Sequence, residues 1–408
     1  MTAVSIDFSD PAIQADPYPI YARLRAESPV VWNEVTQSWL VSRYDDIVSL
    51  FNEPRMSSAR TEAIFRVLPP EAQAEMEPLR RVLGSRMLLT DPPEHTRLKN
   101  LVMQAFSASA TSTRRARIAE ICDELLDRVV AHGELDVMRD LATQAPSWVI
   151  ADLLGVPRDE QGTFARWAHD QVRVYDRPGT THDRVEVMRR GQASMLEMKA
   201  YLEEIIAARR VEPRDDLITQ LVQAEEQGDR LSTDEMVVMV VAILVGGNNS
   251  TAHAIGNAVL TLLRQPDALA QLRVDPALIR TAFEEVLRFE SPVQSTSRVA
   301  SEAFELHGLA LLAGQNVHLL LGSANRDASQ FPEPACFDPA RQPNRHLTFA
   351  HGPHFCLGTS VARATAQIAV GTLVRRCPNL ELVSNTPDWN EGFSFRSVKT
   401  LPVRFVGA

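Results

Sequence analysis

The sequence predicts a mainly α-helical protein, and three observations support this fold class. Apolar residues recur at helical spacing through most of the 408-residue chain. One apolar pattern continues from Ser232 to Leu263, which is roughly 32 residues and about 48 Å of helix. Strand-like patterns are confined to short stretches near the two ends and after residue 292.

The helical patterns follow one another along the chain. Prolines and glycines separate them from irregular segments. The predicted helices lie at 18–28, 45–53, 91–107, about 114–132, 140–154, 158–174, 183–210, 232–263, 277–291 and 361–376. The predicted strands lie at 30–35, 38–43, within 293–320 and within 379–406. The stretch 56–89 is predicted as a long loop with a short helix, and 322–355 as irregular.

Composition favours a soluble, cytoplasmic protein. Hydrophobic residues make up 45% and charged residues 23% of the chain, as in ordinary globular proteins. The net charge of −10 argues against attraction to nucleic acid. The N-terminus lacks a signal-peptide pattern, and the longest apolar run, 236–245, is much shorter than the ~20 residues of a membrane span. No linker or repeat divides the chain, so we expect one domain over residues 1–408.

One of the four cysteines differs in its surroundings. Cys122, Cys336 and Cys377 are expected to be small buried apolar residues. Cys356 lies in the stretch HLTFAHGPHFCLGTSVARA, just before a helix. Backbone N–H groups at a helix start favour a thiolate over a thiol. Gly352 and Gly358 allow the backbone to approach a flat group, and Arg345, His346 and His354 add donors and positive charge.

Four interpretations of Cys356 follow from the residues alone. A buried structural cysteine is the commonest use of an isolated cysteine. Zinc is poorly supported because no second cysteine or metal-spaced histidine pair is present. A Cys–His nucleophile remains open, although no oxyanion-hole motif accompanies it. A single thiolate also suits iron that receives its other ligands from a macrocycle.

The stretch FAHGPHFCLG resembles the haem-binding loop of the cytochrome P450 superfamily, with its pattern FxxGxxxCxG. Phe349, Gly352, Cys356 and Gly358 occupy the four defined positions, within a predicted haem-binding loop at 346–358. The resemblance extends from about residue 10 to the end of the chain. It implies a triangular, mainly α fold with a long central distal helix and a small β-rich region. It also implies haem b (iron protoporphyrin IX) with Cys356 as the proximal iron ligand.

Further motifs match the same superfamily in the expected order. EEVLR matches the ExxR motif, in which Glu285 and Arg288 share one helix face and pair with a later arginine, here Arg341. The segment 91–107 resembles the helix whose side chains hold a haem propionate. His95 matches that pattern, but Lys99 stands where the family usually has arginine and supplies a point charge rather than a fork. Arg298 and His354 match the donors to the other propionate.

The helix centre at LVGGNNSTAH is polar where a core helix is expected to be apolar. Gly246 and Gly247 match the family's small residues beside bound oxygen, and Ser250 followed by Thr251 stands for the usual threonine pair. Asn249 occupies the position of the usual acid. An amide cannot titrate, so it can hold and orient water but cannot supply a proton. We expect Ser250, water and Asn249 to deliver protons more slowly than an acid–alcohol pair, although neutral sequence drift at Asn249 is an equal alternative.

The resemblance also places a substrate pocket in the segments 60–89, 165–180, 236–250, 293–298 and 392–396. Any one apolar residue there is more commonly core. Together they suggest a medium-sized, largely apolar organic molecule of secondary-metabolite type. The predicted pocket residues are Phe65, Met87, Leu88, Val174, Ile243, Val293, Gln294, Ser295, Thr296 and Phe395.

The leading prediction is a haem-thiolate monooxygenase that hydroxylates or epoxidises this substrate with O2 and two electrons. Since the chain ends soon after the last strands, the electrons are expected from a separate ferredoxin- or flavodoxin-type donor and its reductase. The protein is expected to be a monomer. A basic patch for that partner is expected at Arg97, Lys99, Arg114, Arg115 and Arg345. The alternatives are a haem-thiolate enzyme with peroxide-driven, coupling or other non-hydroxylating chemistry, and a non-catalytic haem carrier or sensor.

Overall fold

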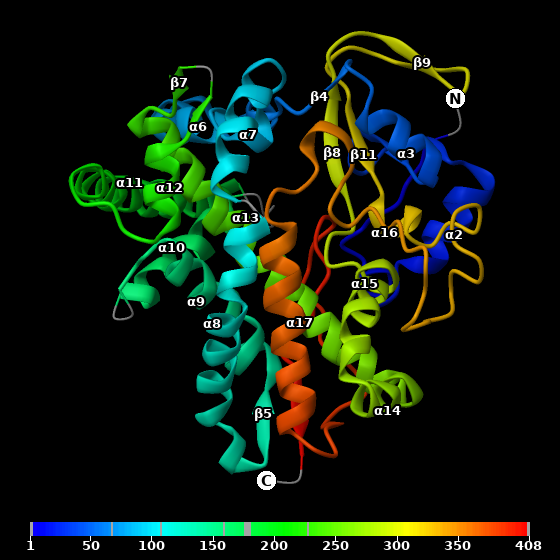
Figure 1. The fold of residues 1–408 in the computed structure, drawn as a ribbon. Coiled ribbons are helices and arrows are strands. Elements are labelled where there is room, and N and C mark those ends of the chain that lie inside the picture. Colours follow the sequence, from blue (N-terminus) through cyan, green and yellow to red (C-terminus); the bar gives the residue numbers. More distant parts are fainter. Residues whose placement is uncertain are drawn as a thin grey trace. The chain divides into compact units, whose positions relative to one another are not determined.

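The computed structural model describes residues 3–66, 68–106, 108–157, 160–174, 181–226 and 228–405. The chain forms two compact units. The first unit comprises residues 1–56, 115–145 and 250–408, and the second comprises 57–114 and 146–249. The mainly α fold with a small sheet region is confirmed (Figure 1). The expectation of one domain over residues 1–408 stays a prediction.

The main sheet belongs to the first unit and has the strand order β1-β2-β3-β11-β8-β4. β2 and β3 are the predicted strand pair, antiparallel with Val31 opposite Leu40. β11 runs parallel to β3 and antiparallel to β8, which brings strands from both ends of the sequence together. The six strands are β1 (Ala3–Val4), β2 (Val30–Asn33), β3 (Ser38–Val41), β4 (Met56–Ser57), β8 (Thr296–Ala300) and β11 (Asn316–Leu319).

Apolar side chains of this sheet and its neighbouring helices form the core of the first unit. Trp39, Val317 and Leu319 from the strands are completely buried together with Ile47. Burial of such side chains is the main driving force for folding. The helices of this unit are α1 (Pro11–Ala15), α2 (Tyr18–Glu27), α3 (Tyr44–Phe51), α14 (Pro266–Val274), α15 (Ile279–Phe289), α16 (Leu321–Ala324) and α17 (Thr359–Arg376).

Two smaller sheets complete the first unit. β13 lies between β12 and β5, so the C-terminal strand pairs with residues 134–136 from the middle of the chain. β9 and β10 form a hairpin whose turn contains His307 and Gly308, both with positive φ, as tight hairpin turns require. Their bounds are β5 (Glu134–Asp136), β9 (Phe304–Leu306), β10 (Leu309–Leu311), β12 (Glu381–Leu382) and β13 (Pro402–Arg404).

The second unit is almost entirely helical. The prediction of a long loop with one short helix over 56–89 is only partly right, since three short helices occupy most of 61–84 and α6 buries Leu79 and Leu83 in the core of this unit. Pro70 begins α5, and a proline at the first helical position is compatible with a helix. The elements are α4 (Thr61–Phe65), α5 (Pro70–Glu75), α6 (Glu77–Gly84), α7 (Glu94–Ala105), α9 (Gln144–Leu153), α10 (Gln161–Arg173), α11 (Thr181–Val211), α12 (Leu217–Gln223), β6 (Glu225–Glu226) and β7 (Asp229–Arg230).

Three of the described helices contribute residues to both units: α8 (Ala108–Asp127), α9 with its first two residues, and α13 (Thr233–Arg264). The predicted long helix is thus confirmed, and its capping box is present, because Ser232 N–H donates to Glu235 and Glu235 N–H donates to Ser232 Oγ. α13 is the one helix in the described ranges that is long and apolar enough to cross a membrane, and 56% of its most apolar stretch is buried in the protein. The core helix of a soluble protein has the same properties.

Candidate active site

The loop that carries Cys356 is closed by its own backbone. Cys356 N–H donates to the carbonyl of Phe349 at 3.1 Å, and Ala350 N–H donates to Leu347 at 2.8 Å. A short 3-10 helix, Gly352–His354, lies inside the loop, and α17 begins directly after Gly358. The loop therefore presents the cysteine at the entrance to a helix, as the sequence predicts.

Gly352 is required by packing within the protein rather than by the approach of a flat group. Its φ is +70°, and an added Cβ would lie 2.9 Å from both Asn52 Oδ1 and the carbonyl oxygen of Phe51 at the end of α3. An L-residue would be strained in this conformation and would also collide with backbone. The structure therefore explains this glycine by its contact with the end of α3, not by the predicted approach of a flat group.

The Cys356 side chain is accessible, and its sulfur accepts a hydrogen bond from the residue two positions later in the chain. The backbone N–H of Gly358 donates to the sulfur, and Arg363 adds positive charge. Desolvation by the surrounding protein outweighs both, so the pKa of the Cys356 thiol is raised. The Gly358 N–H and Arg363 act in the direction expected at a helix start, toward the thiolate. A bound metal ion deprotonates a coordinating thiol outright.

The donor set fits a haem-thiolate group. Cys356 offers one accessible sulfur with one N–H aimed at it. Among the described residues no group of three or more His, Cys, Asp or Glu side chains could hold a metal ion. An iron ion bound here therefore needs its remaining ligands from a macrocycle, as haem supplies them. Cys336 is also exposed, whereas Cys122 and Cys377 are buried as predicted.

Arg363 links the cysteine loop to α15. It lies over the ring of Phe349 at 4.5 Å and donates two hydrogen bonds, at 2.8 and 2.7 Å, to Glu284. His346 contacts the same carboxylate at 3.1 Å. Burial raises the pKa of Glu284, but the bonds from His346 and Arg363 outweigh it and lower the pKa to about 2.

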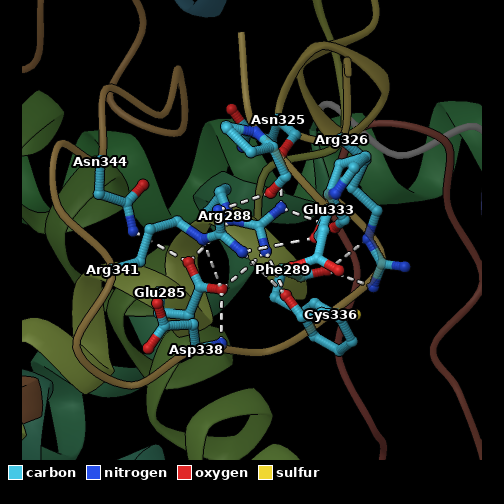
Figure 2. A network of polar contacts seen from close by, with 12 residues as sticks. Glu285, Arg288, Phe289, Asn325, Arg326, Glu333, Cys336, Asp338, Arg341 and Asn344 are labelled. Carbon is cyan, nitrogen blue, oxygen red and sulfur yellow. Dashed lines mark hydrogen bonds and ion pairs between the residues drawn. The ribbon is translucent and has the colours of Figure 1, made fainter.

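The predicted ExxR pairing with Arg341 is present (Figure 2), with Glu285 and Arg288 completely buried and Arg341 half-buried. Arg288 donates two bonds to Glu285, at 2.8 and 2.7 Å, and Arg341 donates a third at 3.1 Å. The remaining bonds to Glu285 come from the Asp338 N–H and Asn344. Arg288 also donates to the carbonyls of Asn325, Pro334 and Cys336. The network therefore fixes the irregular segment 325–344 against α15.

Arg298 and His354, the predicted propionate donors of the first unit, are held in different ways. Arg298 lies on β8 opposite Val317 of β11. It is buried, its guanidinium lies 5.4 Å from the centre of the Phe51 ring, and it donates to the carbonyl of Ser297. His354 is half-buried at the end of the 3-10 helix. Their role toward a propionate stays a prediction.

His95 and Lys99, the donors predicted in the second unit, lie one turn apart on α7. His95 is buried, Lys99 is half-buried, and desolvation lowers the pKa of Lys99. Arg97, predicted as part of a basic patch, is instead surrounded by acids. It bonds to Glu94, Asp229 and Glu235, which leaves this site with more negative than positive charge.

The two glycines of α13 face different surroundings. A Cβ on Gly246 would have no described atom within 4 Å, whereas a Cβ on Gly247 would lie 2.8 Å from Ile150 Cδ1 of α9. Asn248 is buried and accepts a bond from Ser147 Oγ at 2.9 Å. Within the second unit, Gly247 and Asn248 therefore serve helix packing, and Gly246 alone keeps the predicted open space beside the helix.

The next three residues also point in different directions. Asn249 is half-buried and has no hydrogen-bond partner among the described residues. Ser250 is half-buried, but Thr251 is buried, with 4% of its surface exposed. Neighbouring helix positions do not share a face. The expectation that Ser250 and Thr251 face one water-filled groove is therefore not supported for Thr251.

Four of the predicted pocket residues meet within the first unit. Val293 and Phe395 form a β-bridge, Gln294 N–H donates to the carbonyl of Ser394 at 2.8 Å, and Ser295 Oγ donates to Phe393. Phe395 is exposed and Val293 half-buried, as is neighbouring Thr296. The Gln294 side chain instead turns inward to Ser291 and Gly322, so its placement does not support the pocket assignment.

The pocket residues predicted in the second unit are divided between core and surface. Phe65 and Val174 are fully buried in its apolar cluster. Met87 and Ile243 are half-buried, and Leu88 is exposed. The last part of the predicted segment, 175–180, lies outside the described residues. Assignment of these side chains to a substrate pocket stays a prediction.

Sequence reasoning missed several polar groups near these segments. His253 and Asn257 lie on α13 after the motif, and Glu284 precedes the ExxR pair directly. The signal for the first two was a polar residue on each of two successive turns of an apolar helix. Nothing local distinguishes Glu284 from a surface acid, because its partners are more than 60 residues away in sequence.

Comparison with known proteins agrees with this geometry. The family model described as Cytochrome P450 matches residues 36–275 and 277–399. Cytochrome P450 107B1 of Saccharopolyspora erythraea is 40% identical over 97% of this chain and 96% of its own length. The vitamin D(3) 25-hydroxylase of Pseudonocardia autotrophica is 37% identical over 95% of this chain and 93% of its own.

A solved structure matches over the whole chain as well. The epothilone D-bound cytochrome P450epoK superposes with a TM-score of 0.89 at 33% identity, covering 100% of both chains. The accessible Cys356 and the motifs around it thus occur in a sequence and fold shared over the full length with cytochromes P450. The chain belongs to the cytochrome P450 family and is a haem-thiolate oxidoreductase of the monooxygenase type.

Proposed function

We propose that this protein binds haem b through Cys356 and inserts one oxygen atom from O2 into a medium-sized, largely apolar organic molecule, as a hydroxylation or an epoxidation. The accessible Cys356 sulfur with the Gly358 N–H directed at it carries this proposal. In the balanced reaction, substrate, O2, two electrons and two protons give oxidised product and water. A haem-thiolate group supplies the oxygen activation, because the thiolate pushes electron density toward the bound oxygen and favours O–O cleavage.

The residues of the chain bind and orient the reactants. Arg298 and His354 would hold one propionate, and His95 with Lys99 the other. Ser250 supplies a hydroxyl that both donates and accepts a hydrogen bond, and Asn249 orients water without titrating. Gly246 leaves room beside α13. Val293 and Phe395 offer apolar contact to the substrate. The two relatives are named for organic molecules, vitamin D(3) and epothilone D.

The electrons would come from a separate ferredoxin- or flavodoxin-type protein and its reductase, in the cytoplasm. Because Arg97 is neutralised by three carboxylates, the docking surface for that donor would rely on other cations, such as Arg115 and Arg345, both exposed. The substrate would be of secondary-metabolite type.

A ferrous–CO difference spectrum of the purified protein tests the cofactor assignment. We expect the absorption band that is specific for a thiolate ligand. A Cys356→His variant should bind haem and lose that band, while Cys336→Ser, the other exposed cysteine, should keep it. Absence of the band in the unaltered protein would refute the proposal.

A second candidate function rests on Asn249. Because the usual acid is replaced by an amide, chemistry that needs less proton delivery is favoured: peroxide-driven oxidation, oxidative coupling or another non-hydroxylating reaction. Product analysis with peroxide against reductase-supported turnover separates the two. Products formed only with peroxide, or without an added oxygen atom, would favour the second candidate.

A further inference from the structure

A polar stripe continues along α13 beyond the motif, entirely within the first unit. Ser250, His253 and Asn257 stand at positions i, i+3 and i+7, so their side chains share one face of the helix. The rest of this half of α13 is mainly apolar and buried. Polar residues on two successive turns of a core helix need hydrogen-bond partners or carry a free-energy cost.

His253 is a half-buried imidazole with one unused nitrogen. Its ring contacts the edge of the Phe395 ring, with centroids 5.9 Å apart and planes at 68°. Its Nδ1 is buried and has no hydrogen-bond partner in the described part of the chain. Desolvation lowers the pKa of His253 to about 4. The ring is therefore neutral at pH 7, and a neutral imidazole has one donor and one acceptor nitrogen.

Asn257 is fixed by its amide nitrogen and leaves its oxygen unused. Nδ2 donates to the carbonyl of Glu290 at 3.1 Å and to that of Arg396 at 2.9 Å. Two carbonyl partners establish which amide atom is the nitrogen. Oδ1 is buried and has no partner in the described residues. Because side chains four residues apart on a helix are neighbours, one water molecule bonded to both His253 Nδ1 and Asn257 Oδ1 would satisfy both atoms.

A charged network lies next to Asn257. Glu290, at the end of α15, accepts a bond from Tyr18 of α2 at 2.9 Å and is paired with Arg396 of the C-terminal segment. Arg326 lies over the ring of Tyr18 at 3.5 Å. The Glu290 side chain is 12% exposed, so the network reaches the edge of the solvent. A path of polar groups thus extends from solvent to the face of α13 that carries Ser250.

We propose that His253 is a positioning residue for proton delivery: together with Asn257 it holds bound water, through which protons pass from solvent near the Glu290–Arg396 network to Ser250, in place of the acid that Asn249 replaces. The inference rests on the proposed monooxygenase function, which consumes two protons per turnover. The water molecules carry each proton, and the neutral ring and the Asn257 amide hold them by hydrogen bonds without changing their own protonation. Solvent near Glu290 is the ultimate proton donor.

Partition of electrons between organic product and hydrogen peroxide tests this role. In His253→Phe an aromatic ring and its contact to Phe395 remain but the nitrogens are lost. We expect roughly a tenfold fall in product per electron, less than the roughly 100-fold or more of a side chain that transfers the proton itself, because His253 acts through water. His253→Gln keeps a side chain that bonds water without titrating. It should retain more of the product yield than His253→Phe if the loss comes from the bound water rather than from packing. His307→Gln, an exposed histidine paired with Asp46, is the control.

A second-site rescue separates proton delivery from structure. Adding Asn249→Asp to His253→Phe supplies the acid by the route usual in the family, and we expect it to restore most of the product yield. A solvent deuterium isotope effect on product formation should rise in His253→Phe and fall again in the double variant. Equal product yield in unaltered protein and His253→Phe, with an intact ferrous–CO band, would overturn the inference while leaving the proposed function standing. Loss of that band in unaltered protein would instead refute the function.

Two further measurements test the inference without turnover. ¹⁵N-histidine NMR of the haem-loaded protein should show one imidazole that stays neutral down to about pH 5, as the pKa near 4 requires, and that signal should vanish in His253→Gln. A high-resolution crystal structure should show a water molecule bonded to both His253 Nδ1 and Asn257 Oδ1. A dry site there would contradict the inference.

Discussion

The side chain of Ile150 fills the space next to Gly247, so that an added methyl group would lie 2.8 Å from its Cδ1. At the adjacent Gly246 no described atom lies within 4 Å of an added methyl. Both glycines lie on α13, but packing requires only Gly247 to lack a side chain. This difference gives a matched pair of substitutions.

Gly246→Ala should stabilise the protein by about 1 kcal/mol, because alanine is the better helix former and meets no obstacle. Gly247→Ala should gain less or destabilise, because Ile150 must move away. Urea unfolding of both variants measures the difference. If oxygen binds beside Gly246, Gly246→Ala should also lower turnover. Equal stability changes in the two variants would contradict the packing described for Gly247.

Glu285→Gln should destabilise the protein by about 3–5 kcal/mol, because it leaves the buried Arg288 guanidinium without its counter-charge. Glu381→Gln is the matched control, since Glu381 pairs with Arg404 on the surface and such a pair contributes at most about 1 kcal/mol. Denaturant unfolding checks both. A loss below about 1 kcal/mol for Glu285→Gln would show that the network is not a main source of stability.

Acid should weaken the contact between α15 and the cysteine loop. Because the folded pKa of Glu284, about 2, lies below its ordinary value of 4.5, the folded state binds fewer protons than the unfolded state between these values. The stabilisation, on the order of 3 kcal/mol, is complete above pH 4.5 and is lost as the pH falls toward 2. Glu284→Gln should flatten this part of the stability–pH curve, and a curve unchanged by the substitution would be the contrary result.

Asn249→Asp should change how electrons are used, because a carboxylate can carry protons and an amide cannot. We expect more organic product and less hydrogen peroxide per electron, measured in reductase-supported turnover. Asn248→Asp places the same charge one residue earlier, against Ser147, and serves as the control for charge alone. The same partition in Asn249→Asp as in the unaltered protein would remove Asn249 from proton delivery.

Arg97→Gln should affect folding more than electron transfer. Its guanidinium joins α7 to the β6–β7 hairpin and to the first turn of α13 through three carboxylates, which also raise its pKa. We expect a lower melting temperature and an electron-donor affinity changed by less than about threefold, a contribution below 1 kcal/mol. Arg345→Gln should show the reverse pattern. A large loss of electron-donor affinity in Arg97→Gln would instead support the predicted basic patch at this position.

Features that depend on neighbouring residues could be predicted from the sequence. The capping box at Ser232 and Glu235 forms within one turn, and the antiparallel pair β2–β3 is separated by a tight turn. The start of α17 after Gly358 is similarly local. The three short helices of 56–89 were missed because each is too short to show a clear period, and Pro69 and Pro70 suggested a loop.

Features that depend on distant partners could not be predicted. Nothing near Gly352 in sequence shows that Phe51 and Asn52 lie against it, and Gln294 gives no sign of turning toward Gly322. The pairing of Arg341 with Glu285 came from family resemblance rather than from spacing. The burial of Thr251 beside half-buried Ser250 depends on which face of α13 is covered, and an apolar helix does not specify this face.

The closeness of Gly352 to α3 has a consequence for protein engineering. Residues 349–358 are often the obvious unit to exchange between relatives, because one short motif carries the metal ligand. Here the left-handed glycine rests on residues 51–52, and Arg363 reaches back to Glu284. A transplanted loop would carry the ligand but leave both supports behind. Chimeras at this position should therefore exchange the cysteine loop together with residues 51–52 and the segment around Glu284. Libraries that randomise residues 51 and 52 should also change the surroundings of the proximal ligand.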